Sequence, residues 1–140
     1  MTIEGNKALV RRFIDEIFLQ GRADAVDKLL ADDFVPHNWG KAGAGRDAMM
    51  AAIKRASAGL SDARMTIEDV IAEGDKVAVR LTSQDVQTGP FMGLVPSGKS
   101  YEIEEIHVFR IRDGKVTDHW HQGDFLGMMS QLGALPGTTT

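Results

Sequence analysis

Hydrophobic residues recur at every third or fourth position in the first part of the chain. Leu9, Phe13 and Ile17 stand four residues apart, with further apolar residues beside each of them. This period is typical of a helix that buries one face. Gly21 follows the stripe, where a glycine commonly ends a helix because it adopts a left-handed backbone without steric cost. The pattern therefore predicts a helix that Gly21 terminates.

The helical period returns twice more before it stops. It predicts a short helix over Ala23–Ala31 and a longer one over Arg46–Ala58, the latter with Met49 and Ile53 facing inward. Between them, Asp32–His37 is expected to be a short extended piece that its proline interrupts. Three helices are therefore expected in the first half of the chain.

The second half of the chain alternates apolar and polar residues with a period of two, which is typical of strands with one buried face. Two turn signals, Gly74-Asp75 and Asp113-Gly114, divide this region into hairpins. The expected strands are Met65–Glu73, Lys76–Thr88, Lys99–Arg112 and Lys115 to about His121. A short apolar segment, 125–132, follows them and is compatible with a helix.

Helices followed by antiparallel hairpins indicate an α+β fold, in which helices pack on one face of a sheet. Long strands twist, and the sheet curls around any space that the helices leave open. The length of 140 residues fits one domain. We expect that domain to cover residues 1–134 and to leave 135–140 as a flexible tail.

Composition narrows the classes of function. The net charge of −4 comes from interspersed acids and bases without a basic block, so nucleic acid is not an expected partner. The absence of cysteine excludes disulfides and a cysteine nucleophile. No apolar run approaches the ~18 residues that a membrane span needs, and no signal-peptide stretch opens the sequence. We therefore expect a cytoplasmic protein that does not bind membranes.

The Asp113-Gly114 turn also predicts which side chains share a face, because a two-residue loop sets the register of its hairpin. In that register His107 pairs with Trp120, and paired residues lie on one face. The predicted face combines apolar walls with a few polar groups, as ligand pockets do. It carries Tyr101, Ile103, Glu105, His107, Phe109, Ile111, Val116, Asp118 and Trp120.

The opposite face is expected to lie outside the pocket. In the predicted register it carries Ile106, Val108, Arg110, Thr117, His119 and His121. The two histidines at 119 and 121 have a spacing that allows a metal site, but no third ligand is in view, so no metal is expected. Ile106, Val108 and Thr117 are the predicted contact of a homodimer.

Several segments of the chain match the pattern of one known family. In order along nearly the whole chain, they are Asn6–Phe13, Leu30–His37, Ile67–Arg80, Phe91–Lys99, Phe109–Val116, His119-Trp120, Asp124 and Leu126-Gly127. In these segments the chain resembles the SnoaL-like polyketide cyclases, a branch of the nuclear transport factor 2-like superfamily. The resemblance implies a cone-shaped, curved antiparallel sheet with N-terminal helices packed on its concave face around a pocket.

The same resemblance implies an ester cyclase that closes a ring by intramolecular aldol condensation without a cofactor. In that family an aspartate after the last strand is the general acid/base, and Asp124 matches it; His107 matches a histidine near the substrate, and His37 a loop histidine. A carboxylate in an apolar pocket has a raised pKa and exchanges protons near neutral pH. His107 would donate a hydrogen bond to the enolate oxygen. The other expected substrate contacts are Trp39, Tyr101, Glu105, Phe109, Asp118, Trp120, Phe13, Met50 and Phe91.

Each catalytic candidate also has a purely structural interpretation. Asp124 stands directly before an apolar segment, where an aspartate commonly caps a helix. His107 is also compatible with a hydrogen-bonded core histidine, and His37 with a solvated loop position. The sequence leaves these alternatives open.

Other functions are compatible with the same fold, which hosts several chemistries. A hydrolase or an isomerase would use the same aspartate, although an isomerase also needs tyrosine and protonated-acid donors, and Tyr101 is the single tyrosine. A non-catalytic dimer that binds a small molecule would need the pocket but no base. The His119-Trp120-His121 and Asn38-Trp39 segments depart from the common family pattern and leave the substrate open. The expected ligand in every case is an apolar small molecule.

Overall fold

The computed structural model describes residues 2–38 and 45–135, so the contact expected of Trp39 and the predicted tail after residue 135 lie outside the described residues. The helical elements are α1 (Ile3–Phe13), the π-helical segment η1 (Ile14–Leu19), α2 (Ala23–Leu29), α3 (Gly45–Gly59) and α4 (Phe125–Gln131). The strands are β1 (Leu30–Pro36), β2 (Leu60–Glu73), β3 (Lys76–Gln87), β4 (Ser100–Arg112) and β5 (Lys115–Gly123). Within the described ranges, no helix has the length and apolar character needed to cross a membrane.

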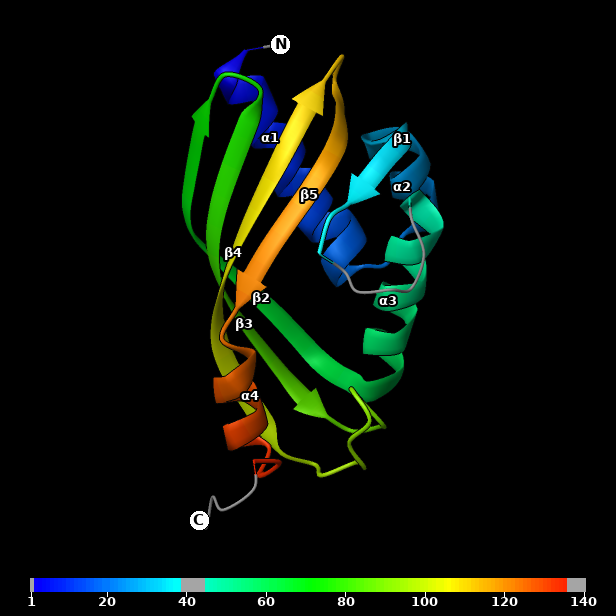
Figure 1. Cartoon of the computed structure of the whole chain (residues 1–140), viewed down its shortest axis with the longest axis vertical. Coiled ribbons are helices and arrows are strands. Elements are labelled where there is room, and N and C mark those ends of the chain that lie inside the picture. The colour runs from blue at the N-terminus through cyan, green and yellow to red at the C-terminus, as the bar shows by residue number, and fades with distance from the viewer. Residues whose placement is uncertain (1, 39–44, 136–140) are drawn as a thin grey trace.

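The strands form one sheet in the order β1-β5-β4-β3-β2 (Figure 1). The pairs from β5 to β2 are antiparallel, as the turn signals predict, but β1 runs parallel to β5. The sheet is therefore mixed, and the prediction of a wholly antiparallel sheet is wrong at this edge. The cause is topological, because β1 joins the sheet through a long crossover that contains α3 and the other three strands.

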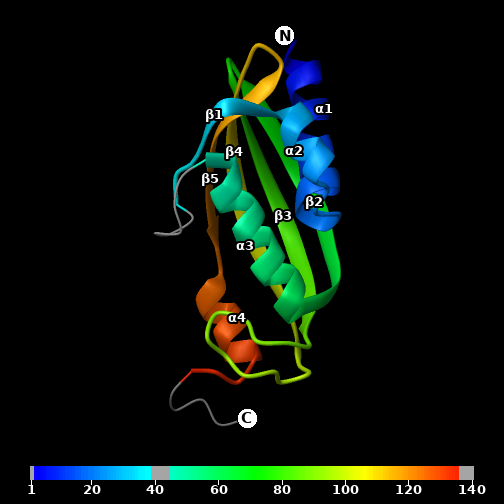
Figure 2. The same ribbon diagram turned by 90° about the vertical axis from the view of Figure 1, so that its right-hand side faces the viewer.

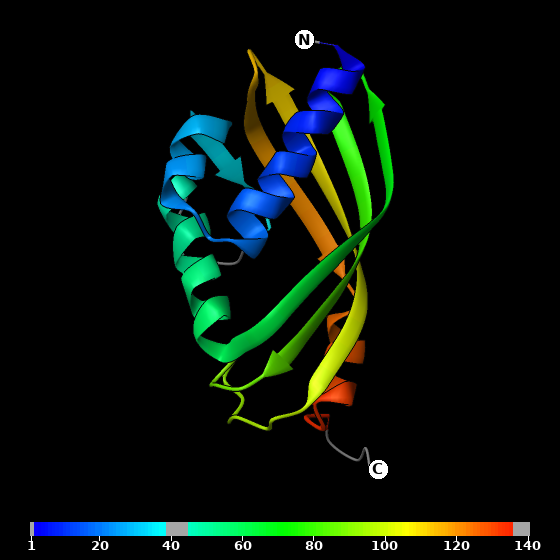
Figure 3. The ribbon, with the colours of Figure 1, turned by 180° about the vertical axis from the view of Figure 1, so that it is seen from behind.

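The sheet is strongly twisted and curved, and helices cover its concave side. Figure 3 shows α1 lying diagonally across the sheet, and Figure 2 shows α3 running beside it on the same side. The short helix α4 packs against β4 at the opposite end of the molecule from α1. The α+β prediction is confirmed, as is the order of its elements.

The predicted helical stripe forms the centre of the core. Phe13 and Ile17 are fully buried, and the rings of Phe13 and Phe109 meet edge to face at a centroid distance of 5.0 Å. Gly21 ends the helical run with a φ of 62°, as predicted. Met49 and Ile53 of α3 also face the core. Burial of this apolar surface is the main force that holds the helices to the sheet.

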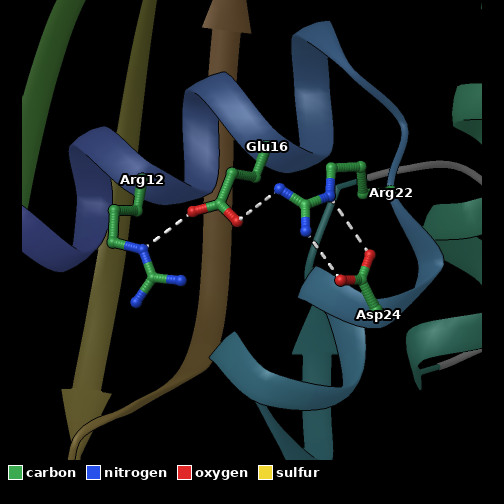
Figure 4. A network of polar contacts seen from close by, with 4 residues as sticks. All are labelled: Arg12, Glu16, Arg22 and Asp24. Carbon is green, nitrogen blue, oxygen red and sulfur yellow. Dashed lines mark hydrogen bonds and ion pairs between the residues drawn. The ribbon is translucent and has the colours of Figure 1, made fainter.

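A chain of ion pairs on the surface joins η1 to α2 (Figure 4). Glu16 accepts hydrogen bonds from Arg12 at 2.7 Å and from Arg22 at 3.2 Å, and Arg22 also binds Asp24 at 2.7 Å. The hydrogen bond from Arg12 lowers the pKa of Glu16. Because exposed ion pairs contribute little free energy, this network orients the turn at Gly21 rather than stabilising the core.

The convex face of the sheet carries a row of apolar side chains. Ile71, Ala78, Val108 and Trp120 are directly paired across four strands, and Ile106 beside them is 51% exposed. Exposed apolar surface of this kind favours association with a second surface. The predicted homodimer would use this face.

We expect the protein to sediment as a dimer at micromolar concentration and the Ile106→Glu variant to sediment as a monomer. The substitution would place two carboxylates in an apolar contact, where their desolvation is unfavourable. Ser130→Glu, which adds the same charge on exposed α4, is the control and should remain dimeric. A monomeric wild-type protein would remove the homodimer prediction.

Candidate active site

The inner face of the sheet changes from apolar to polar along its strands. Next to α1 the buried side chains are hydrocarbon, namely Val77, Val79, Leu81, Phe109, Ile111 and Val116. The inner face also buries polar side chains: His107 and His119 lie directly beside Val79 and Phe109, and Ser83, Asp85, Gln87 and Tyr101 lie farther along β3 and β4, with the apolar Ile103 among them. Buried polar groups are costly unless they are hydrogen-bonded, so this second region is the candidate active site.

A β-bulge on β5 decides which residues reach that region. The hairpin begins in the predicted register, with Ile111 opposite Val116, but Arg110 then lies opposite Asp118, and Thr117 is the extra residue. The Thr117 hydroxyl lies 2.6 Å from Asp118 Oδ1 and 3.3 Å from the Arg110 carbonyl oxygen, and its one hydrogen is shared between these acceptors. An inserted residue of this kind reverses the facing of every later side chain on the strand.

The predicted register is therefore wrong beyond Val116. His107 lies opposite His121 rather than Trp120, and Phe109 lies opposite His119 rather than Asp118. The sequence-based assignment placed His119 and His121 outside the pocket, whereas they share the inner face with His107. Asp118 and Trp120 occupy the outer face.

Three imidazole rings stack at the centre of the polar region. The ring centroids of His107, His119 and His121 lie 5.1 to 5.5 Å apart, with interplanar angles of 11° to 24°. Phenylalanine rings enclose this group, since Phe18 lies 5.3 Å from His107 and Phe125 lies 6.1 Å from His121. We call His107, His119 and His121 the imidazole cluster.

Glu105 extends the cluster into a hydrogen-bonded row. Glu105 Oε1 lies 3.0 Å from His107 Nε2, and His107 Nδ1 lies 2.9 Å from His119 Nε2. Because an ionised carboxylate accepts hydrogen bonds and cannot donate them, His107 Nε2 carries the proton in this contact. His107 Nδ1 then accepts from His119 Nε2–H. The row Glu105–His107–His119 thus has a defined direction of donation.

Burial keeps two of these rings neutral. Burial, and then the neighbouring His107 and His121, hold the pKa of His119 well below its usual value. Burial, followed by His107, lowers the pKa of His121 to about 4. Both rings are therefore uncharged at neutral pH, when each still has one N–H donor and one acceptor nitrogen.

The backbone of the cluster is fixed by the end of β1. His37 N–H donates to the His119 carbonyl at 2.8 Å. The side-chain amide of Asn38 accepts from His121 N–H at 2.9 Å and donates to the His121 carbonyl. The Asn38 amide therefore continues the strand pairing beside the two inward histidines.

The outer-face residues form a separate group. The rings of His37 and Trp120 stack at 4.4 Å and 3°, and His37 Nε2 lies 2.7 Å from Asp118 Oδ2. Burial opposes ionisation of Asp118, but hydrogen bonds with Thr117 and His37 hold its pKa below the usual range. Arg110 lies over the Trp120 ring at 5.4 Å. The bulge thus places Asp118 and Trp120, together with the His37 ring that contacts both, on the side of the sheet away from His107.

Asp124 lies at the start of α4. Its carboxylate accepts from Gly127 N–H at 2.9 Å, and its side chain is exposed to solvent. The helix-cap interpretation is confirmed. Its catalytic role stays a prediction. Asp124 follows the bulged strand β5 and is not part of the row of Glu105 and His107.

The remaining expected contacts fall at different depths. Phe13 is in the core, Met50 packs at the edge of that core, and Phe91 is half-buried in the loop after β3. Tyr101 is on the inner face and donates to Asp85 at 2.8 Å. Nothing in these positions alone makes them substrate contacts, so they stay predictions.

Sequence reasoning missed the polar residues of β3. Ser83 and Asp85 follow Val79 and Leu81 at the same two-residue spacing, so the alternation of the predicted strand already places them on the inner face. That signal was sufficient to find them. It also shows that the polar part of the inner face includes β3 as well as β4 and β5.

The arrangement suits proton transfer rather than metal binding. In the part of the chain that the structure describes, no three histidine, aspartate or glutamate side chains converge to hold a metal ion. His107 Nδ1 and His119 Nε2 are hydrogen-bonded to each other, whereas metal ligands point their nitrogens toward one common centre. A carboxylate hydrogen-bonded to an imidazole can accept a proton and return it.

Acid should destabilise the protein through the buried histidines. Folding lowers the pKa values of His119 and His121, so below pH 6.5 the unfolded chain binds more protons than the folded protein does. The free energy of unfolding should therefore fall from pH 6.5 toward pH 4, by about 1.4 kcal/mol per pH unit for each proton. Urea titration at several pH values measures this slope. His119→Phe should reduce it, whereas the control Ser130→Ala, on the exposed face of α4, should not; equal slopes in all three proteins would contradict the burial argument.

Comparisons with known proteins give the family. The family model described as SnoaL-like polyketide cyclase matches residues 8–132. Aklanonic acid methyl ester cyclase DauD from Streptomyces sp. (strain C5) is 30% identical over 135 residues, which cover 89% of this chain and 80% of DauD. Nogalonic acid methyl ester cyclase from Streptomyces nogalater is 31% identical over 124 residues, which cover 83% of this chain and 89% of that enzyme.

A solved structure agrees with these relatives. The structure of TsrD from Streptomyces laurentii has a TM-score of 0.87 and 31% identity, covering 96% of this chain and 99% of TsrD. The fold implied by the sequence resemblance is therefore confirmed. The chain belongs to the SnoaL-like polyketide cyclase family.

Proposed function

We propose that this protein is an ester cyclase that closes a ring of a polyketide methyl ester by intramolecular aldol condensation, without a cofactor. The names of two relatives, an aklanonic and a nogalonic acid methyl ester cyclase, support the substrate class. The observation that carries the proposal is the row Glu105–His107–His119 on the inner face.

The reaction needs one proton to leave a carbon and one to reach an oxygen. In the first step, the Glu105–His107 pair accepts the proton from the carbon next to a carbonyl, which leaves an enolate. The enolate carbon then bonds to the second carbonyl carbon, and the new alkoxide takes the proton back from the pair. No proton or electron is gained or lost overall. A carboxylate hydrogen-bonded to an imidazole can carry the proton in both transfers.

The row has properties that this cycle requires. The side chain of Glu105 is 11% exposed and that of His107 is 3% exposed, so Glu105 is the more accessible member. His119 Nε2–H donates to His107 and fixes the orientation of that ring, as a third group does in other acid–base arrays. Phe18 and Phe125 make the surroundings of the cluster more apolar, which strengthens the electrostatic interactions within it.

The proton carrier proposed from the geometry differs from the Asp124 of the sequence resemblance. Asp124 is exposed and occupied as a helix cap, whereas Glu105 and His107 lie inside. Both assignments concern the same reaction. Substitution of Asp124, Glu105 and His107, one at a time, distinguishes them.

Turnover of aklanonic acid methyl ester and nogalonic acid methyl ester, followed by chromatography of the cyclised product, tests the proposal. We expect His107→Gln to lower kcat about 10²–10⁴-fold, the usual range for loss of an acid–base group. Glu105→Gln should lower it similarly, because the amide cannot accept the proton. Glu104→Gln, on the outer face of the same strand, should retain activity.

Asp124→Asn is the decisive companion variant. Asparagine caps a helix as well as aspartate does, so the fold should be retained, and we expect turnover within a few-fold of wild type. Loss of turnover in Asp124→Asn with activity retained in His107→Gln would assign the proton transfer to Asp124. A wild-type protein that binds both esters but converts neither would contradict the enzyme proposal and favour a non-catalytic binder.

A further inference from the structure

A second polar group lies on the inner face, beside the row that the proposed mechanism uses. Ser83, Asp85 and Gln87 of β3 and Tyr101 of β4 are all buried, with exposures of 1% to 7%. Gln87 has a structural explanation, because it accepts from Ser97 at 2.7 Å and donates to the Val95 carbonyl at 3.1 Å, which anchors the loop after β3. The other three residues have no such partner in a loop.

Asp85 and Tyr101 are directly paired across β3 and β4 and share a hydrogen bond. Tyr101 O–H donates to Asp85 Oδ2 at 2.8 Å, and Ser83 Oγ lies 3.5 Å from the same oxygen. The charged group that acts on both is Glu105, another acid. Within the described residues, no lysine, arginine or histidine forms an ion pair with Asp85. Burial first, and Glu105 in addition, raise the pKa of Asp85.

A buried acid without a cation is an unfavourable choice for stability alone. An asparagine would accept the same hydroxyl hydrogen bonds and would not carry a charge that must leave water. The aspartate therefore has a property that packing does not require.

We propose that Asp85 and Tyr101 bind a hydroxyl group of the substrate and orient it toward Glu105 and His107. This inference rests on the proposed cyclase function in that it takes the ligand to be the substrate. The binding site itself does not depend on catalysis. Asp85 and Tyr101 are positioning residues in this account, since the Glu105–His107 pair moves the proton.

A hydroxyl fits this pair in either protonation form of Asp85. When Asp85 is ionised, its second oxygen accepts from the ligand hydroxyl. When Asp85 is protonated, the acid and the phenol have two hydrogens for one mutual bond, so one O–H remains to donate to the ligand oxygen. A ketone oxygen would be bound only by the second form.

The experiment compares two rigid probes that differ by one free hydroxyl, 2-hydroxyanthraquinone and anthraquinone, whose dissociation constants are measured by fluorescence quenching. For the wild-type protein we expect binding of the hydroxylated compound to be about tenfold tighter, the usual contribution of one buried hydrogen bond. Tyr101→Phe and Asp85→Asn should each reduce this preference to within about twofold. Glu104→Gln is the control and should retain it.

Thermal unfolding separates ligand binding from a structural role. If the pair serves the ligand, Asp85→Asn should unfold at the same temperature as wild type or above it, because a desolvated acid has been removed. A lower unfolding temperature in Asp85→Asn, with the hydroxyl preference unchanged, would overturn the proposal and assign the pair to the fold.

The two proposals fail in different ways. A wild-type protein without hydroxyl preference overturns the Asp85–Tyr101 site, whatever its turnover of the methyl esters. A wild-type protein that prefers the hydroxylated probe but converts no ester retains the site and overturns the cyclase proposal. In an active enzyme, Tyr101→Phe should raise KM more than it lowers kcat, since ground-state binding is what it removes.

Discussion

The candidate active site depends on one extra residue in β5. Thr117 forms a bulge opposite Arg110, and every side chain after it faces the other side of the sheet from the side that a regular hairpin would give. With the bulge, His119 and His121 point inward and stack on His107. Without this extra residue, Trp120 and Asp118 would face the interior. The local hydrogen bonds of the Thr117 hydroxyl support the bulged backbone.

The bulge creates an interior that is apolar in its walls and polar at its centre. Core packing of the α1 stripe closes one end, and the polar residues of β3, β4 and β5 fill the region beyond it. Neutral imidazoles are tolerated there because each can donate and accept one hydrogen bond. A carboxylate is tolerated where an imidazole or hydroxyl donates to it, as happens at Glu105 and at Asp85. The same low-dielectric surroundings that make these groups costly also make them effective in proton exchange.

Most of the fold follows from sequence periodicity. The α1 stripe, the Gly21 terminus and the inward side of α3 were all given by spacing of apolar residues, and Asp113-Gly114 marked the hairpin. Periodicity does not reveal the parallel pairing of β1 with β5, because that depends on where a distant segment returns to the sheet. The family resemblance identified the concave face and its helices, which the SnoaL-like match over residues 8–132 supports.

The candidate site was harder to predict, because its errors come from a single backbone irregularity. His107 was placed correctly on the inner face, since its strand is regular, whereas Trp120 and His119 exchanged faces. No residue type near Thr117 marks a bulge by itself, as glycine marks a turn. Asp85, by contrast, was accessible from the alternation of β3. A regular strand can therefore be assigned to faces from sequence, and a bulged one needs coordinates.

The central claim is that the bulge brings His107 and His119 into a shared hydrogen bond inside the protein. Nitrogen NMR of the imidazole groups measures this directly, through the scalar coupling that passes between two nitrogens across a hydrogen bond. We expect a coupling between His119 Nε2 and His107 Nδ1 and a neutral His119 ring at pH 5.5. Absence of the coupling, together with a His119 ring that titrates near pH 6.5 as an exposed histidine does, would contradict the account.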